Sequence, residues 1–306
     1  MRRTAAALLA IGLSVSACSP TTKTPSRQPS SAAASVQTGS PRAADDEGQT
    51  LPSPDGPIPQ GASNLARELA TTWTARRFAV AAWVEGGGAA TWPPPEELEV
   101  LVLHEQRIYR LLASRPALAE RVLELVAPEL VPEATSNVRA GAALFRHTTP
   151  LTRLPDFRTR APEPADVLRG YFRSAERRFG VEWEVLAAVM LIETRMGRVV
   201  SRSSAGAQGP MQFLPSTWDA YGLGGDVQDE ADAVIGAANY LAASGAPADY
   251  REALYRYNPV DAYVTAVTQY AKVMRRDPEA YYAYYNWQVF VRTTHGDVRL
   301  TGPGLG

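Results

Sequence analysis

The stretch IETRMGRVVSRSSAGAQGPMQFLPSTW, residues 192–218, carries the features that decide the fold of this chain. Glu193 ends an apolar run that begins near Val185, and a loop rich in Ser, Arg and Gly follows. Because the run is apolar all round, it predicts a buried central helix rather than an amphipathic surface helix. A carboxylate at the end of such a helix is costly to ionise, which makes Glu193 a candidate for chemistry.

Two physical effects bear on the proton of Glu193. Desolvation raises the pKa of a buried carboxyl, and the C-terminal end of a helix also disfavours negative charge. Both effects favour a proton held near neutral pH, which a general acid requires. Arg195 and Arg198 would oppose them if they faced the carboxyl. The alternative is a glutamate that simply leaves the core at the end of its helix.

The rest of the folded part is predicted to be mainly α. Apolar residues recur at helical spacing, and Gly or Pro separates the segments. No strand–helix alternation occurs, and residues 289–300 alone suggest a small hairpin, turning at His295-Gly296. Asn64 is a candidate cap for the first helix, and Ser216 with Asp219 has capping-box spacing. Six predicted helices have both bounds: 65–84, 133–145, 166–179, 181–193, 230–244 and 250–257. A further helix follows Pro93–Pro95 and includes Leu98 to Leu112, and another starts at Pro116, with Leu118, Val122, Leu125 and Val126 on one side. The last is indicated by an apolar stripe from Val260 to Met274.

The N-terminal residues predict export. Residues 1–17 hold two arginines, a short apolar stretch and small residues, as in a secretory signal peptide. The ending Val15-Ser16-Ala17-Cys18 resembles the lipobox of bacterial lipoproteins, which implies a lipid on Cys18 and a membrane partner. An ordinary signal with an unrelated cysteine is the alternative, but Cys18 is the one cysteine of the chain. Residues 18–61 are rich in Ser, Thr, Pro and Ala and predict a disordered tether.

The segment 203–212, SSAGAQGPMQ, with Pro215 and Thr217 behind it, resembles the signature of SLT-type lytic transglycosylases. Further along, Arg256-Tyr257-Asn258 is similar to the third block of that family. The start Glu-Thr-Arg-Met-Gly-Arg, residues 193–198, is similar to membrane-bound lytic transglycosylase B. The resemblance covers roughly residues 165–275. It implies a lysozyme-like catalytic lobe over residues 165–300, which the helical lobe 62–150 precedes.

The resemblance also implies an activity and its residues. Members of the family cleave the β-1,4 bond between N-acetylmuramic acid and N-acetylglucosamine in peptidoglycan strands, without water, and leave a 1,6-anhydro end. Glu193 would be the single acid and base, with help from the substrate's acetamido group. Neither a cofactor nor a metal is implied, and cell-wall enzymes are conceivable partners. The implied substrate contacts are Ser203, Met211, Gln212 and Tyr257, and the serine block comes one residue later than usual, so Ser201 and Ser204 stay alternatives.

Other functions receive less support from the sequence. The net charge of −1 predicts no broad basic face for nucleic acid. A hydrolytic muramidase would need a second carboxylate to activate water, and the acids from Asp219 to Asp232 are better explained as helix caps. A glycan-binding lipoprotein without activity would not need Glu193. The lipid, the tether and the substrate together predict a place in the cell envelope, facing the wall.

Overall fold

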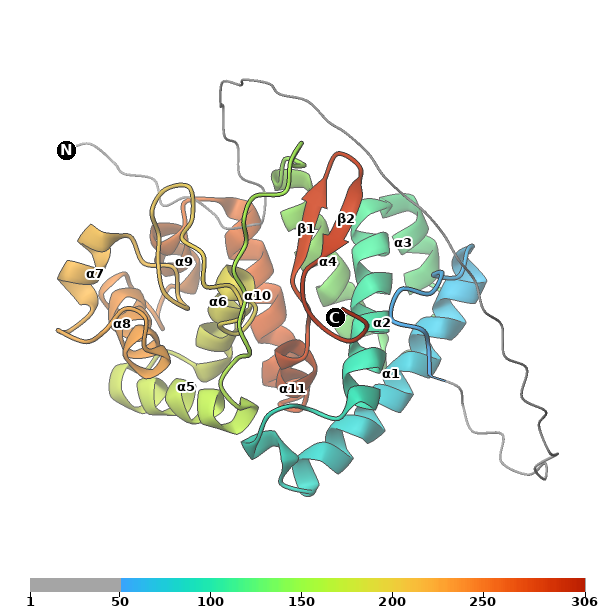
Figure 1. Cartoon of the computed structure of the whole chain (residues 1–306), viewed down its shortest axis with the longest axis horizontal. Helices are drawn as coiled ribbons and strands as arrows, with labels where there is room; N and C mark the ends of the chain where they lie inside the picture. Colours follow the sequence, from blue (N-terminus) through green and yellow to red (C-terminus); the bar gives the residue numbers. More distant parts are fainter. Residues whose placement is uncertain (1–50, 306) are drawn as a thin grey trace, which may run out of the picture.

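The computed structural model describes residues 51–305, and these form a mainly helical molecule with one small antiparallel hairpin. Figure 1 shows the N-terminal helices α1–α4 on one side, α5–α9 on the other, and α10 and α11 between them. The predicted signal peptide, Cys18 and most of the predicted tether lie outside the described residues. The elements are α1 Ala62–Glu85, α2 Glu96–Ser114, α3 Pro116–Leu123, α4 Val131–His147, α5 Ala165–Phe179, α6 Trp183–Thr194, α7 Pro215–Tyr221, α8 Glu230–Ala243, α9 Tyr250–Tyr257, α10 Asp261–Arg276, α11 Ala280–Tyr285, β1 Phe290–Thr293 and β2 Gly296–Arg299, with one short 3₁₀ turn at Gly88–Ala90.

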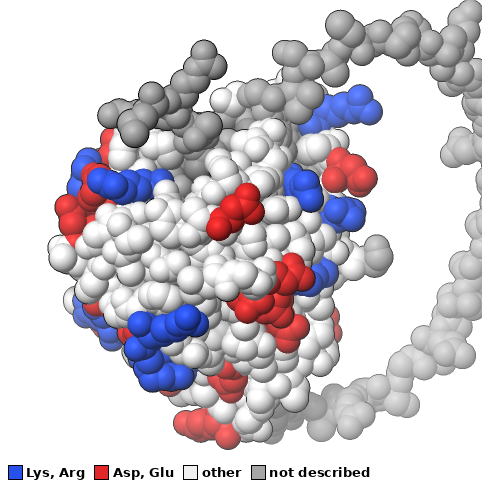
Figure 2. All heavy atoms as spheres, turned by 90° about the vertical axis from the view of Figure 1, so that its left-hand side faces the viewer, with Lys and Arg blue, Asp and Glu red and all other residues white. Residues whose placement is uncertain are grey.

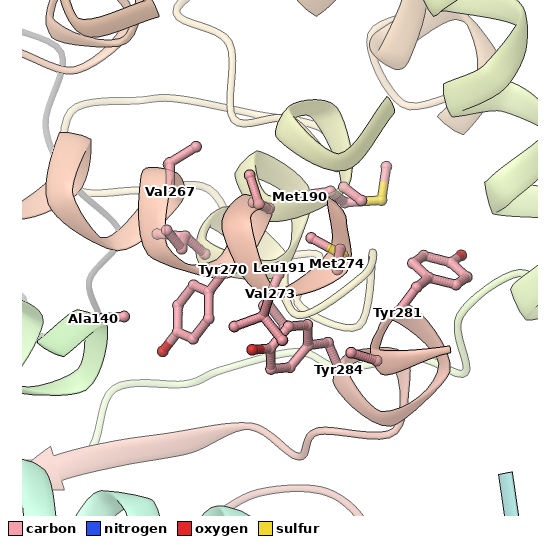
Figure 3. Close-up of a cluster of buried hydrophobic side chains, with 14 of the residues drawn as sticks. Ala140, Met190, Leu191, Val267, Tyr270, Val273, Met274, Tyr281 and Tyr284 are labelled. Atoms are coloured by element: carbon pink, nitrogen blue, oxygen red, sulfur yellow. The ribbon is translucent and has the colours of Figure 1, made fainter. Parts of the chain in front are cut away.

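Helix α10 is the element that both halves of the molecule share. It packs against α4 on one side and α6 on the other, and Figure 3 shows its buried side chains meeting residues of both. Tyr270, Val273 and Met274 of α10 are buried, as the apolar stripe of its sequence predicts. One large core therefore runs through both halves of the described body, and a second, small cluster forms around Val199 and Val289.

The C-terminal tail packs inward. The aromatic side chains of α11 and Trp287 are all buried, so they pack onto the core and do not line an exposed groove. The strands β1 and β2 pair with Thr293 opposite Gly296, which puts the turn at Thr294-His295, one residue earlier than the sequence suggested.

Three local predictions need correction. Asn64 does not cap α1, because the helix already begins at Ala62 and the Asn64 side chain donates to the carbonyl of Gln60. Ser216 is not a cap either, since Pro215 takes the first position of α7 and no side chain caps that helix. Leu125 lies beyond the end of α3 and is 55% exposed.

The predicted tether also ends too late. Residues 51–61 lie on the folded body, where the guanidinium of Arg107 donates to the backbone carbonyls of Pro54 (3.0 Å) and Gly56 (2.7 Å). Arg299 pairs with Asp55 at 2.9 Å. These charge-assisted bonds offset the entropy of ordering a segment that is poor in apolar side chains. No helix in residues 51–305 combines the length and the apolar character that a membrane crossing requires.

Candidate active site

Helix α6 places Glu193 at the end of a helix that is buried on every side. All of its residues except Glu184 are buried, because the segment offers the surrounding helices apolar side chains all round. The helix ends where Arg195 and Met196 both adopt positive φ, 54° and 58°. This turn redirects the chain into the loop directly after the carboxylate.

The environment of Glu193 favours its protonated form. The side chain is only 5% exposed, and burial raises the pKa of its carboxyl from 4.5 to about 8. None of the ion pairs within residues 51–305 includes Glu193, so no arginine compensates for the lost hydration. A carboxylic acid that holds its proton at neutral pH can give that proton to a leaving oxygen.

A polar neighbour of the carboxyl is Tyr263 in the first turn of α10. Burial is the larger effect on the pKa of Glu193, and the Tyr263 hydroxyl opposes it by lowering that pKa. The pair falls short of full hydrogen-bond geometry, and the buried Tyr263 hydroxyl has no other partner in the described residues. Nothing in the sequence marks this tyrosine as a functional residue, although it stands between Val260 and Val264 of the predicted apolar stripe.

Tyr257 lies behind Tyr263 and supports the loop. The two rings stack with centroids 6.3 Å apart and planes within 3°. The Tyr257 hydroxyl donates to the backbone carbonyl of Met211 at 2.7 Å, so its hydrogen bond goes to the loop and not to Glu193. The negative charge of an ionised Glu193 raises the pKa of Tyr257, after the larger effect of burial, which places the ring near the carboxyl.

The loop that follows α6 is closed by its own hydrogen bonds. Ser203 is buried, and its Oγ accepts from the backbone nitrogen of Ala207 at 2.9 Å. Gln208 and Phe213 pair through both backbone bonds at 2.9 Å. The hydroxyl of Ser203 therefore shapes the loop while its own proton stays available. Of the alternatives, Ser201 accepts from the backbone of Arg158 and Ser204 is exposed.

Met211 and Gln212 occupy the inner side of the same loop. Met211 is fully buried, which makes it a support beneath the loop rather than an open wall of a groove. Gln212 has φ 52° and its amide nitrogen donates to the carbonyl of Gly209, while its amide oxygen is buried without a partner. Gly209 has φ 74°, and a Cβ there would stand 1.9 Å from the carbonyl oxygen of Val227. Glycine at position 209 therefore allows the loop to pack directly against the backbone at Val227.

Thr194 fastens the end of α6 to the loop. Its hydroxyl donates to the carbonyl of Pro210 at 2.7 Å and accepts from the backbone nitrogen of Gly197 at 3.1 Å. A proline in this position lacks a backbone donor, but its carbonyl remains available. Glu193 and the loop are thus held to one another through the neighbouring residue.

Four of the five acids downstream are engaged in local structure, although only Asp229 is a helix cap and Asp219 has no partner in the described residues. Asp229 caps α8 by accepting from the backbone nitrogen of Asp232, and Asp232 accepts from the backbone of Asp226. Glu230 pairs with Arg160. Figure 2 shows acidic side chains in small groups on this side of the molecule, separated by wide uncharged surface. Trp218 is half-buried and packs edge-on against Phe213 (5.1 Å) at the edge of the core.

Metal chemistry receives no support in the described part of the chain. No group of three or more His, Cys, Asp or Glu in residues 51–305 has a metal-binding arrangement. His104 is buried beside Glu68 at 2.8 Å, which accounts for it as a packing histidine.

Comparison with known proteins gives one match. The family model described as the transglycosylase SLT domain matches residues 170–284, which run from α5 to α11 and include Glu193 and the loop. Searches of the curated proteins and of the solved structures return no match.

Proposed function

We propose that this chain, which belongs to the SLT-type lytic transglycosylases of the lysozyme-like superfamily, cleaves peptidoglycan through Glu193 and leaves 1,6-anhydro ends. The chain is a peptidoglycan lytic transglycosylase, a lyase acting on glycan. The product and the mechanism are our inference. The observation that carries it is the buried carboxyl of Glu193, whose pKa is raised to about 8.

The first step uses the proton of Glu193. The carboxyl gives it to the glycosidic oxygen, and the bond from that oxygen to C1 of N-acetylmuramic acid breaks. The acetamido oxygen of the same sugar bonds to C1 and takes up the positive charge. This substrate-assisted route needs no second carboxylate and is a known exception to the two-carboxylate rule.

The second step returns the proton. The Glu193 carboxylate accepts the proton of the C6 hydroxyl, O6 bonds to C1, and the acetamido oxygen leaves C1. Glu193 is then protonated again, and no water is consumed. Tyr263 is placed to steady the carboxylate between the two steps, because a nearby hydroxyl favours the charged form.

Most of the acids near the loop are already engaged, which favours this mechanism over hydrolysis. Asp226, Asp229 and Asp232 accept backbone hydrogen bonds in turns and caps. Glu230 is held by Arg160. Asp219 is exposed on α7 and has no partner in the described residues, so Asp219 is the acid that a hydrolase would have to use to activate water.

The test is a digest of purified peptidoglycan, analysed by mass, with wild type and Glu193→Gln side by side. Muropeptides lighter by one water than the reducing forms, absent with the variant, support the proposal. Reducing ends would instead identify a hydrolase, and anhydro products from Glu193→Gln would exclude Glu193 as the acid.

We also propose that the enzyme is exported to the cell envelope and anchored by a lipid on Cys18. The support is the sequence of residues 1–18, which lie outside the described residues. Labelling with a fatty acid that depends on Cys18 is expected, and equal labelling of Cys18→Ala would refute the anchor.

A further inference from the structure

A pocket lies between the N-terminal helices and the C-terminal hairpin. Helices α2 and α4, the end of α6, α10 and the strands β1 and β2 enclose it, with about 820 Å³ of space, part of it open to solvent. Figure 1 shows the hairpin over α4 and beside α2. Glu193 does not line the pocket, and only three of its lining residues, Ile192, Arg195 and Tyr270, belong to the matched SLT region. The reaction proposed for Glu193 therefore does not account for this pocket.

The charged groups of the lining are mostly cations. They are Arg110, Arg195 and Arg292, with Asp297 as the single acid. Arg110 donates twice to Asp297, at 2.8 and 2.6 Å. Arg292 donates only to two backbone carbonyls at the end of α4, at 2.7 and 2.8 Å, and Arg195 only to a backbone carbonyl of α6. Two guanidinium groups of the lining therefore lack a carboxylate partner among the described residues.

The surroundings of Arg195 agree with a cation that lacks a counter-charge. Burial lowers the pKa of its guanidinium to about 10, Tyr270 opposes this, and Arg110 and Arg198 lower the pKa further. None of these neighbours is a carboxylate. Arg110 and Arg195 thus lie close enough to repel one another, and an anion bound beside them would relieve that repulsion.

Two donors of the lining residues are buried without an acceptor. The Nε of Arg195 and the Nε1 of Trp287 make no hydrogen bond within residues 51–305. Trp287 is only 4% exposed. Buried polar groups in folded proteins are nearly always hydrogen-bonded, so these two donors indicate an acceptor that a ligand supplies.

Apolar and aromatic side chains form much of the remaining lining. They include Ala113, Leu144, Phe145, Ile192 and Phe290. Two of the rings lie against guanidinium groups, with Arg292 Cζ 3.7 Å from the centre of Phe145 and Arg110 Cζ 4.5 Å from that of Phe290. A mainly apolar wall with a few polar groups is typical of sites for small organic molecules. An inorganic ion would leave this wall uncovered.

We propose that this pocket is a binding site, separate from the reaction centre, for a small organic anion in which a carboxylate or phosphate group is attached to an apolar body. Arg195 and Arg292 are the cations available to the anionic group, and the indole N–H of Trp287 is a further donor. Guanidinium groups bind the oxygens of carboxylates and phosphates through charge-assisted hydrogen bonds. The apolar wall would cover the body of the ligand.

The decisive measurement is the binding of small probes to the full chain, followed by NMR titration in a buffer free of phosphate and carboxylate. Phenylacetate and phenyl phosphate carry the anionic group, phenylacetamide replaces it with a neutral group of similar shape, and acetate lacks the apolar body. Hydrogen bonds to a charged group correspond to at least about a tenfold difference in Kd. We expect at least one of the two aromatic anions to bind tenfold more tightly than phenylacetamide and acetate. The tighter of the two identifies the anionic group.

The indole N–H resonance of Trp287 locates the bound probe. Trp287→Phe identifies this resonance by its loss, and the resonance should shift with the preferred anion. Arg195→Gln and Arg292→Gln should each reduce the preference for the anion over phenylacetamide. Arg121→Gln is the control, because Arg121 is exposed on α3 and makes no ion pair within residues 51–305. Melting temperatures establish that each variant is folded.

Four outcomes would overturn the proposal. The first is phenylacetamide binding as tightly as both aromatic anions, and the second is acetate binding as tightly as phenylacetate. The third is a preference for the anion that survives both Arg195→Gln and Arg292→Gln, or that Arg121→Gln also removes. The fourth is tight binding of the anion without a shift of the Trp287 resonance. The comparison of probes with the wild type needs no variant, so a variant that fails to fold does not prevent the test.

Discussion

The raised pKa of Glu193 makes a prediction about stability. Between pH 4.5 and about 8 the unfolded chain releases a proton that the folded chain keeps. Folding therefore takes up a proton in this range, and the free energy of unfolding falls as the pH rises. Glu193→Gln removes this dependence, so the variant should become more stable than the wild type at high pH.

The size of the effect follows from the two pKa values of Glu193. The difference between 4.5 and about 8 corresponds to roughly 5 kcal/mol at the alkaline plateau and about 3 kcal/mol at pH 7. The amide of the glutamine is also buried and costs about 1–3 kcal/mol without partners. We therefore expect Glu193→Gln to gain about 2–4 kcal/mol at pH 9 and to lose about 1–3 kcal/mol at pH 4, where only the cost of the buried amide remains.

The assay is denaturant unfolding of both proteins at several values from pH 4 to pH 9. Glu120→Gln is the control, because Glu120 is exposed on α3 and makes no ion pair in the described residues. Its curve should follow that of the wild type. A stability difference between Glu193→Gln and the wild type that is the same at pH 4 and pH 9 would refute the reasoning, since it would show that Glu193 titrates alike in both states.

Three further substitutions test the machinery around the carboxyl. Tyr263→Phe removes a group that lowers the pKa of the Glu193 carboxyl. The cleavage rate of the wild type is expected to fall above about pH 8, and in the variant this fall should move to higher pH. A fall at the same pH in both proteins would contradict this role of Tyr263. Gly209→Ala places a Cβ 1.9 Å from the Val227 carbonyl oxygen, at a residue with φ 74°. The variant should lose more than about 2 kcal/mol of unfolding free energy and most of its activity. An unchanged unfolding midpoint would show that the loop can accommodate the methyl group. Thr194→Val leaves the Pro210 carbonyl and one backbone nitrogen without their partner and should cost about 1–3 kcal/mol; a cost below about 0.5 kcal/mol would show that water replaces the hydroxyl.

The sequence predicted those features that depend on local pattern. The apolar run before Glu193 indicated a buried helix, and the structure confirms α6 with Glu193 near its end. The predicted helix 166–179 ends where α5 ends, at Phe179 before Gly180, and Asp229, one of the acids interpreted as caps, does cap α8. In each case a residue and its partner lie within a few positions of one another, so that spacing alone fixes the contact.

The features that the sequence did not predict depend on residues far apart in the chain. Tyr263 reaches Glu193 only because α10 packs on α6, and no spacing encodes that pairing. The pocket at Arg195 needs α2 and the hairpin at Asp297, nearly 190 residues apart, to close around it. The resemblance implied Tyr257 as a substrate contact, whereas in the structure its hydroxyl donates to the backbone carbonyl of Met211.

The division into a helical lobe and a catalytic lobe describes the sequence better than it describes the packing. Helix α10 buries one side against α4 and the other against α6. The tail adds hydrogen bonds to both sides, since Tyr284 donates to Asn137 of α4 and Tyr281 to the carbonyl of Ala165. Helix α10, which carries Tyr263 next to Glu193, is therefore held in place from both sides, by α4 of the N-terminal half and by α6 itself.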